Sequence, residues 1–286
     1  MSDHLRGVGL TVLGGLLLVP DALFVRLIMA EPLVIAFWRG IFAGGLVLAF
    51  VIWYRGPGAV VAVFRAGGQT WAYILFYGIS APGFVLAVSL TSVANVVFIL
   101  AAMPVFAAIF SRIWLKEPIS ARMVWTMLGV FVGLGVILRG SHETAGASWQ
   151  GALVALGVAA RCAAALTAVR GGRANSMLAA VPVSLVGSAC VIALFVDVLA
   201  PLAQYWPLML AHGVFIAGAA GLLVLGPRYL SSAEVALLIL LEAVFAPLLV
   251  WYVIGENPGA WALMGGGIVI AVLIVSNLVM LARRPA

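Results

Sequence analysis

Long apolar segments follow one another along almost the whole chain, and short stretches between them hold most of the charged residues. A helix needs about 20 predominantly apolar residues to cross the hydrocarbon core of a bilayer. Cutting the chain at charges, prolines and glycine-rich breaks predicts ten such helices, over residues 7–28, 33–54, 69–90, 94–115, 121–139, 149–170, 177–199, 207–228, 232–254 and 260–282. The two longest polar stretches, 55–69 and 139–148, are too short for a soluble domain. The pattern predicts an all-α polytopic membrane protein.

The composition agrees with this fold class. The residues are 65% hydrophobic and 8% charged, whereas about a quarter of the residues of a soluble domain are charged. The net charge of +6 does not indicate nucleic-acid binding, because the basic residues are scattered singly between apolar segments. Cys162 and Cys190 fall inside apolar segments and are expected to be small buried hydrophobes. No spaced Cys/His set predicts a metal site, and no cofactor is expected.

The basic residues also predict an orientation, since Lys and Arg are enriched on the cytoplasmic side of membrane proteins. We read the first apolar segment as a retained helix and not as a cleaved signal peptide. With the N-terminus inside, eleven basic residues fall on the inside and three, Arg26, Arg39 and Arg139, on the outside. Arg161 lies within a helix and belongs to neither side. The chain is therefore expected in the inner (plasma) membrane of the cell, with both termini in the cytoplasm.

An internal repeat divides the chain into two halves. At an offset of 139 residues, segment 91–118 aligns with segment 230–258 and places Glu117 on Glu256. The first and sixth predicted helices align more weakly at an offset of 144. Residues 1–143 and 144–286 are thus expected to be two five-helix repeats of one membrane domain. Because five is odd, the second repeat would be inverted, and inverted repeats around a central cavity are typical of secondary transporters.

Two segments resemble a known family. The stretch AAMPVFAAIFSRIWLKEPIS resembles the helix 4 to helix 5 segment of the drug/metabolite transporter (DMT) superfamily, EamA type, and in EPLVIAFWRGIFAGGLVLAF Arg39 resembles the arginine that opens helix 2. The resemblance implies a carrier that exports amino acids or other metabolites. The overall pattern is most similar to the YddG-like aromatic amino-acid exporters. The second repeat departs from the first, with Ala243 in place of Pro104 and Glu242 in place of Met103.

Two ionisable residues near the middle of the membrane are candidates for substrate binding. Charges within spanning segments are costly and usually functional, and both Arg161 and Glu242 fall near the centre of a predicted helix. They are expected either to bind the carboxylate and ammonium groups of a zwitterion, with Glu242 as a further candidate for a coupling proton, or to form an ion pair with each other. Aromatic side chains suited to stacking on a solute are Tyr77, Trp38 and Phe98, although aromatic residues also concentrate at membrane interfaces.

A second set lies closer to the outside. Asp21 and Arg39 are expected to pair across adjacent helices, either as a structural link or as an outer gate. His212, at similar depth, is either a buried hydrogen-bonded residue or a proton relay. Prolines kink helices by removing a backbone hydrogen bond, and the predicted hinges are Pro82, Pro104 and Pro247.

The sequence therefore predicts a secondary transporter that exports small metabolites by alternating access, with amino acids, aromatic or otherwise neutral, as the first choice of substrate. Efflux of lipophilic cations is the alternative, and a channel or a scaffold protein is less favoured. No catalytic dyad, HExxH motif or phosphate-binding loop is present, which argues against an enzyme. The expected partners are a small-molecule substrate and the lipid bilayer. The glycine motifs at 40–44, 129–133 and 265–267 are expected to pack helices within a monomer, with a dimer as the alternative.

Overall fold

In a computed structural model of the chain, the described residues are 3–140, 148–171, 177–199, 202–225, 229 and 232–282. They form thirteen helices and no strand. The first seven are α1 (Asp3–Leu18), α2 (Asp21–Leu27), α3 (Pro32–Arg55), α4 (Gly58–Phe64), α5 (Gly68–Leu90), α6 (Val93–Leu100) and α7 (Met103–Trp114). The others are α8 (Ala121–Gly140), α9 (Trp149–Gly171), α10 (Met177–Ile192), α11 (Leu202–Leu225), α12 (Ser232–Ile254) and α13 (Ala260–Ala282).

The helices are long and apolar enough for a multi-pass membrane protein. Among the described residues, eight helical segments meet the length and hydropathy of a membrane span: His4–Leu27, Pro32–Arg55, Gly68–Leu90, Val93–Trp114, Ala121–Gly140, Trp149–Ala168, Leu202–Leu223 and Ala260–Met280. Two shorter apolar segments, Leu178–Ile192 and Leu240–Ile254, lie in α10 and α12. The number of ten spanning helices therefore stays a prediction.

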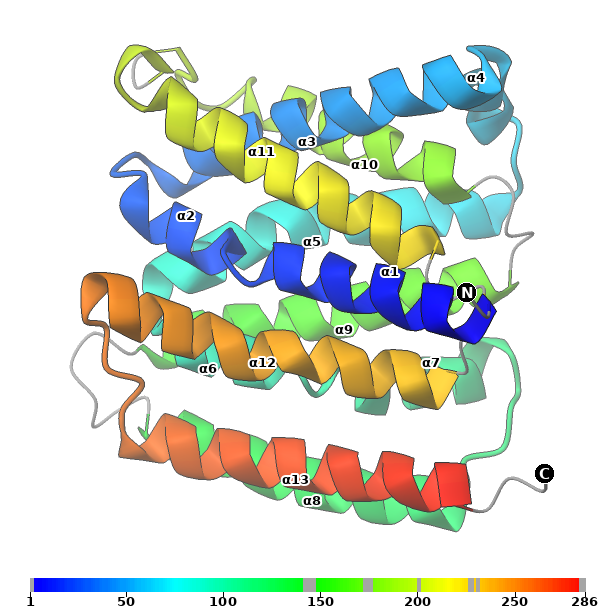
Figure 1. Cartoon of the computed structure of the whole chain (residues 1–286), viewed down its shortest axis with the longest axis vertical. Coiled ribbons are helices and arrows are strands. Elements are labelled where there is room, and N and C mark those ends of the chain that lie inside the picture. The colour runs from blue at the N-terminus through cyan, green and yellow to red at the C-terminus, as the bar shows by residue number, and fades with distance from the viewer. Residues whose placement is uncertain are drawn as a thin grey trace.

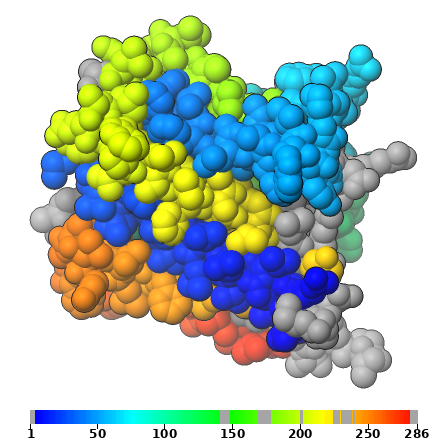
Figure 2. All heavy atoms as spheres, turned by 45° about the horizontal axis from the view of Figure 1, so that its top comes forward, coloured from blue at the N-terminus to red at the C-terminus, as the bar shows by residue number. Residues whose placement is uncertain are grey.

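The helices lie side by side in one bundle (Figure 1), and the start of α1 and the end of α13 are at the same edge. At one end of the bundle α8 packs along α13, and at the other α3 packs against α10 and α11. Figure 2 shows a face on which α11 lies between α3 and α1, and α12 lies beyond α1. In the middle of the bundle α5 packs along α9. Large exposed apolar side chains on the outer helices, such as Trp125, Phe131 and Val275, suit contact with lipid acyl chains.

Two spanning segments are broken by a proline, because proline cannot donate a backbone hydrogen bond and its ring collides with the carbonyl four residues earlier. The helix before Pro20 ends at Leu18, and α2 begins at Asp21. The helix before Pro104 ends at Leu100, the residue four positions earlier, and α7 begins at Met103. These breaks divide the first and fourth spanning segments into two unequal parts each, with the longer part before the first break and after the second.

Several predicted boundaries agree with the structure to within one or two residues, but three features differ. Segment 58–64, predicted as part of a loop, forms the short helix α4 after Pro57. The helix predicted to reach residue 199 ends at Ile192, and beyond it the Asp197 carboxylate accepts a hydrogen bond from the amide of Leu199, as in a turn. Helix α11 begins at Leu202, not at 207, because Pro207 lies early enough in the helix to remove only one hydrogen bond close to its start.

Candidate functional site

A buried cluster of three ionisable side chains joins three helices near the break after Pro20. Asp21 is the first residue of α2, Arg39 lies on α3 and His212 on α11. The Arg39 Nε and Nη2 atoms donate to the two Asp21 carboxylate oxygens at 3.0 and 2.6 Å. The His212 Nε2 atom lies 2.5 Å from Asp21 Oδ1. The three residues are only 4%, 7% and 1% exposed, respectively, so the cluster is shielded from solvent.

Aromatic rings isolate the charges of this cluster. Phe24, one turn after Asp21, stacks on the His212 imidazole with ring centroids 5.3 Å apart and an interplanar angle of 19°. The Arg39 guanidinium carbon lies 5.7 Å from the centroid of the Phe84 ring, within range of a cation–π contact. In such surroundings the charges are screened weakly, so each depends strongly on its partners.

A second ionic cluster ties three segments at the outer end of the predicted topology. The Arg26 Nε atom, at the end of α2, lies 2.8 Å from Glu256 Oε2, in the connection between α12 and α13. Arg26 Nη2 also donates to the Thr91 carbonyl at 3.0 Å, and Glu256 Oε1 accepts from the Val93 amide at 2.7 Å. Arg26 had entered the sequence analysis only as a basic residue outside the membrane. Its partner is 230 positions away in the chain, so local sequence carried no signal for this link.

We expect Glu256→Ala to loosen the start of α6. The variant removes the acceptor of the Val93 amide and the carboxylate beside Arg26. Hydrogen–deuterium exchange of the peptide that covers residues 91–96 should accelerate about tenfold, because a lost hydrogen bond to a charged group is worth about 1.5 kcal/mol or more. Glu31→Ala, an exposed carboxylate at the start of α3 with no capping hydrogen bond, is the control. Unchanged protection of residues 91–96 in Glu256→Ala would contradict this role.

The two predicted substrate-binding charges do not pair with each other, although Glu242 lies within electrostatic range of Asp21 and Arg39. Among the described residues no ion pair links Arg161 and Glu242, and neither has a hydrogen bond through its side chain. The Arg161 side chain is exposed although it lies near the middle of α9. Glu242 is half-buried near the middle of α12. The predicted alternative in which they form a mutual ion pair is therefore not found.

The register of α5 against α9 shows what lies near Arg161. A side chain added at Gly83 would meet Val158 at 2.9 Å, and one added at Gly151 would meet Thr91 at 2.7 Å. These contacts define an antiparallel register that sets Ser80 opposite Arg161 and Tyr77 one turn further along α5. Half-buried Tyr77 stacks on Tyr73 with ring centroids 5.4 Å apart. Tyr73, one turn earlier, completes an aromatic pair on this helix.

The other two predicted aromatic residues have mainly packing contacts. Trp38 donates its indole N–H to the Val198 carbonyl at 2.8 Å and stacks on Phe42. Phe98 is buried, and its ring fills the space that a side chain at Gly266 of α13 would occupy. Trp38 thus anchors α3 to the segment after α10, and Phe98 anchors α6 to α13.

The predicted hinge prolines differ in their effect on the backbone. Pro104 lies at the break between α6 and α7, whereas α5 continues through Pro82 and α12 continues through Pro247. The prolines of the fourth and ninth spanning segments thus differ, since Pro104 lies at a break and Pro247 inside a continuous helix, and the kink expected at Pro247 stays a prediction. Neighbouring helices allow a spanning helix to run on past a proline. The structure places its other break at Pro20, which has no counterpart in α9.

The small-residue motifs bring helices of the same chain together. A Cβ added at Gly133 of α8 would lie 2.7 Å from the Gly265 carbonyl of α13, and Gly44 of α3 is similarly close to Val186 of α10. Close packing between helices of the same chain therefore explains these glycine motifs.

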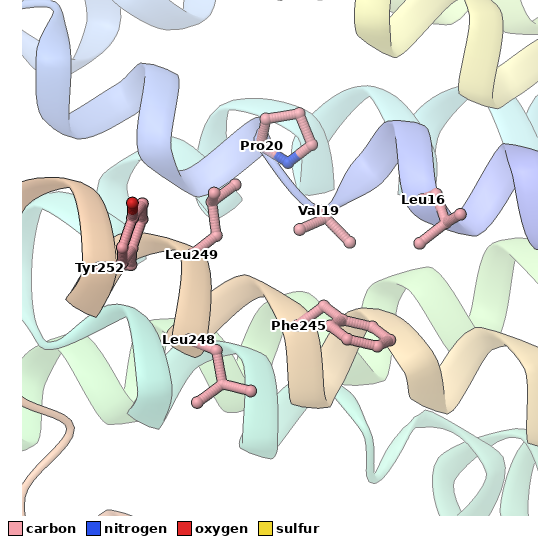
Figure 3. Close-up of a pocket in the computed structure, with 7 residues that line it drawn as sticks. All are labelled: Leu16, Val19, Pro20, Phe245, Leu248, Leu249 and Tyr252. Atoms are coloured by element: carbon pink, nitrogen blue, oxygen red, sulfur yellow. The ribbon is translucent and has the colours of Figure 1, made fainter.

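Two pockets of the structure do not include the candidate substrate-binding residues. An apolar groove of about 420 Å³ runs between the end of α1 and α12 (Figure 3) and is lined by Leu16, Val19, Pro20, Phe245, Leu248, Leu249 and Tyr252. A cleft of about 320 Å³ lies between α7, α8 and α13. It extends from Pro104 to a polar end that is lined by Arg122 of α8 and Ser276 of α13. Neither is lined by Arg161, Glu242 or Tyr77. Within the described residues, no group of three or more His, Cys, Asp or Glu side chains is arranged to hold a metal ion.

Comparisons with known proteins agree with a membrane transporter. Residues 5–139 match the model of the EamA-like transporter family. No curated protein matches the chain. A solved structure described only as "Crystal structure of protein" has a TM-score of 0.67 and 17% sequence identity, and the alignment covers 98% of this chain and 99% of that one. That likeness shows that the two chains share a fold over their whole length.

Proposed function

We propose that the chain is a secondary transporter of the EamA type that exports small metabolites, with neutral and above all aromatic amino acids as substrates. The observation that carries the proposal is the match of residues 5–139 to the EamA-like transporter family. We extend this assignment to the second half because segments 91–118 and 230–258 are similar in sequence. A carrier is favoured over an enzyme, since the buried ionisable groups form an ion-pair cluster without a catalytic nucleophile.

The packing of the helices supports two inverted halves, residues 1–143 and 144–286. In a pair of repeats related by a two-fold axis, each contact has a counterpart in which the two halves exchange roles. Helices α3 and α10 pack on each other, as do α8 and α13, and α6 and α12. The contact between α1 and α11 corresponds to the contact between α9 and α5 in the other half. In the same way, the contact between α1 and α12 corresponds to the contact between α9 and α7. Alternating access through relative movement of such halves is the mechanism expected of this architecture.

The distribution of basic residues supports cytoplasmic termini in an inner (plasma) membrane. The start of α1, the end of α3, α4, the end of α7 and the start of α8 lie toward one edge of the bundle (Figure 1), and these helix ends carry or adjoin six basic residues: Arg6, Arg55, Arg65, Arg112, Lys116 and Arg122. Arg26 and Arg139 belong to the last turns of α2 and α8, and these helix ends lie toward the opposite edge. Since basic residues are enriched on the cytoplasmic side, we assign the first edge to the cytoplasm.

The proposed solute site lies between α9 and α12, with Arg161 and Glu242 as its charged groups. A lone charge that faces hydrocarbon is costly, so an exposed arginine in the middle of a spanning helix is expected to face water. Arg161 would bind a substrate carboxylate and Glu242 the ammonium group. Tyr77 would stack on an aromatic side chain, and Trp38 and Phe98 would support the walls of the pathway. Pro104, together with Pro20, would let the outer and inner ends of the first half move, whereas Pro82 and Pro247 remain as points at which α5 and α12 bend.

The proposal is tested with purified protein in liposomes and a panel of L-phenylalanine, L-tryptophan, L-alanine and the lipophilic cation tetraphenylphosphonium. We expect saturable transport of the aromatic amino acids. Arg161→Ala and Glu242→Gln should each weaken it about tenfold or more, because a hydrogen bond to a charged group is worth about 1.5–3 kcal/mol. The matched controls are Arg65→Ala and Glu31→Gln, which change exposed side chains at the membrane surface.

Two results would contradict the proposal. Normal amino-acid flux in both Arg161→Ala and Glu242→Gln would show that the solute site lies elsewhere. Transport of tetraphenylphosphonium with no amino-acid transport would assign the carrier to lipophilic-cation efflux. Glu242 and the aromatic residues would suffice to bind such a substrate.

A further inference from the structure

We infer that Asp21, Arg39 and His212 are the proton-binding site of this transporter, and that His212 takes up and releases the proton that drives export. The inference rests on the proposed transport function and adds its energy source. The solute site assigned above does not use these three side chains. They nevertheless form the most completely buried ionic cluster among the described residues.

The contact with Asp21 determines which nitrogen of His212 is available. An ionised carboxylate only accepts hydrogen bonds, so His212 Nε2, at 2.5 Å from Asp21 Oδ1, must carry a hydrogen and donate it. The other nitrogen, Nδ1, is buried and has no hydrogen-bond partner. In the neutral imidazole this atom carries a lone pair. A proton that reaches His212 therefore binds at Nδ1, and the ring becomes an imidazolium that still donates to Asp21.

The charges of the cluster allow this uptake without loss of the ion pair. Arg39 stays protonated in proteins, and its two contacts with Asp21 balance one positive and one negative charge. Histidine is the member of the cluster whose charge ordinarily changes between pH 5 and 8. The cluster is neutral with a neutral imidazole and carries one positive charge after uptake. Each cycle moves one proton onto Nδ1 from one side of the membrane and releases it from Nδ1 to the other.

The surroundings of His212 leave Asp21 and Arg39 as the ionic groups in contact with it. Helix α11 packs against α1, α2, α3 and α10. Within the membrane these helices carry Asp21 and Arg26 on α2, Arg39 on α3 and the exposed thiol of Cys190 on α10. The ionisable groups of α1 are at its cytoplasmic end, as is Arg55 of α3. Tyr77 on α5 and Glu242 on α12 lie on helices that do not contact α11 closely, but both helices pack against α2, and both residues interact electrostatically with Asp21 and Arg39.

The position of Asp21 connects the proton to movement of the backbone. Asp21 is the first residue of α2, immediately after the break at Pro20, and the other end of α2 carries Arg26 in the outer ionic cluster. Asp21 and Arg39 belong to the first half, whereas His212 belongs to the second. A change in the charge of His212 thus acts on a short helix that is separately hinged and on the contact between the two halves. This arrangement links protonation of His212 to opening of the outer end of the transporter.

The first test follows the proton without any transported solute. In a variant with His4→Gln and His142→Gln, His212 is the remaining histidine, and its nitrogen-15 resonances report the protonation of each ring nitrogen. We expect Nδ1 to gain a proton reversibly as the pH falls from 8 to 5. An imidazole that keeps one protonation state across this range would overturn the inference.

The second test separates coupling from transport, with L-phenylalanine as the probe. In wild-type liposomes an imposed pH gradient should drive accumulation of up to about tenfold per pH unit for one proton per solute. His212→Gln should lose this accumulation and the accompanying proton flux but keep exchange of L-phenylalanine across the membrane. His4→Gln is the matched control and should behave like the wild type.

The outcomes are distinguishable from a failure of the proposed function. Gradient-driven accumulation of wild-type size in His212→Gln would overturn the inference. Loss of exchange in both His212→Gln and His212→Asn would also overturn it, because the residue would then be structural. If the wild type moves no L-phenylalanine but His212 titrates at Nδ1, the proton site stands and the substrate assignment fails.

Discussion

The Arg39→Met variant is expected to lose about 3–5 kcal/mol of stability, which is the cost of leaving a buried carboxylate without its cationic partner. Arg39 makes two hydrogen bonds to Asp21 in surroundings that exclude solvent. Methionine fills a similar volume but leaves Asp21 with His212 alone. We expect a lower midpoint of thermal unfolding in detergent and less folded protein in the membrane. Arg65→Met, a change of an exposed arginine, should have little effect.

A double-mutant cycle identifies the source of this loss. Asp21→Asn removes the other charge of the pair, and the double variant Asp21→Asn/Arg39→Met should be more stable than Arg39→Met alone, because no buried charge remains unpaired. Arg39→Lys should be intermediate, since lysine keeps the charge but not the two-pronged geometry. An Arg39→Met protein as stable as the wild type would contradict the role of the pair in holding α2 to α3.

The second large effect is expected where α8 packs on α13. A Cβ at Gly133 would lie 2.7 Å from the Gly265 carbonyl oxygen, a backbone atom that cannot move aside cheaply. Gly133→Ala should therefore destabilise the protein by about 1–3 kcal/mol through overpacking, and Gly133→Leu by more. Gly135→Ala is the matched control on the same helix, because a Cβ at Gly135 meets nothing within 4 Å. Equal thermal stability of Gly133→Ala and Gly135→Ala would contradict the close approach of the two helices.

Local hydropathy predicts much of this fold because each spanning helix must satisfy its own backbone hydrogen bonds in lipid. The predicted bounds 232–254 and 260–282 coincide with α12 and α13, where charges and a glycine-rich connection flank the apolar segments. The breaks are less predictable. Pro20 and Pro104 interrupt their helices, but Pro82 and Pro247 do not. Whether a helix ends at a proline depends on the neighbouring helices, which a local pattern does not contain.

The candidate site shows the same division between local and long-range information. Asp21 and Arg39, on adjacent helices, were predicted to pair from their similar depth. The contact of His212 with Asp21 spans 191 positions and depends on how α11 packs against α2. The Arg26–Glu256 link is longer still. Depth alone also suggested that Arg161 and Glu242 could pair, but depth does not specify the direction in which each side chain leaves its helix.

Exchange of L-phenylalanine in liposomes distinguishes a carrier with alternating access from a channel. The flux of labelled substrate is measured with and without unlabelled L-phenylalanine on the opposite side. We expect a saturable flux that substrate on the opposite side accelerates, because the loaded site reorients faster than the empty one. A flux that rises linearly with concentration and does not respond to substrate on the opposite side would contradict the carrier mechanism and indicate a channel.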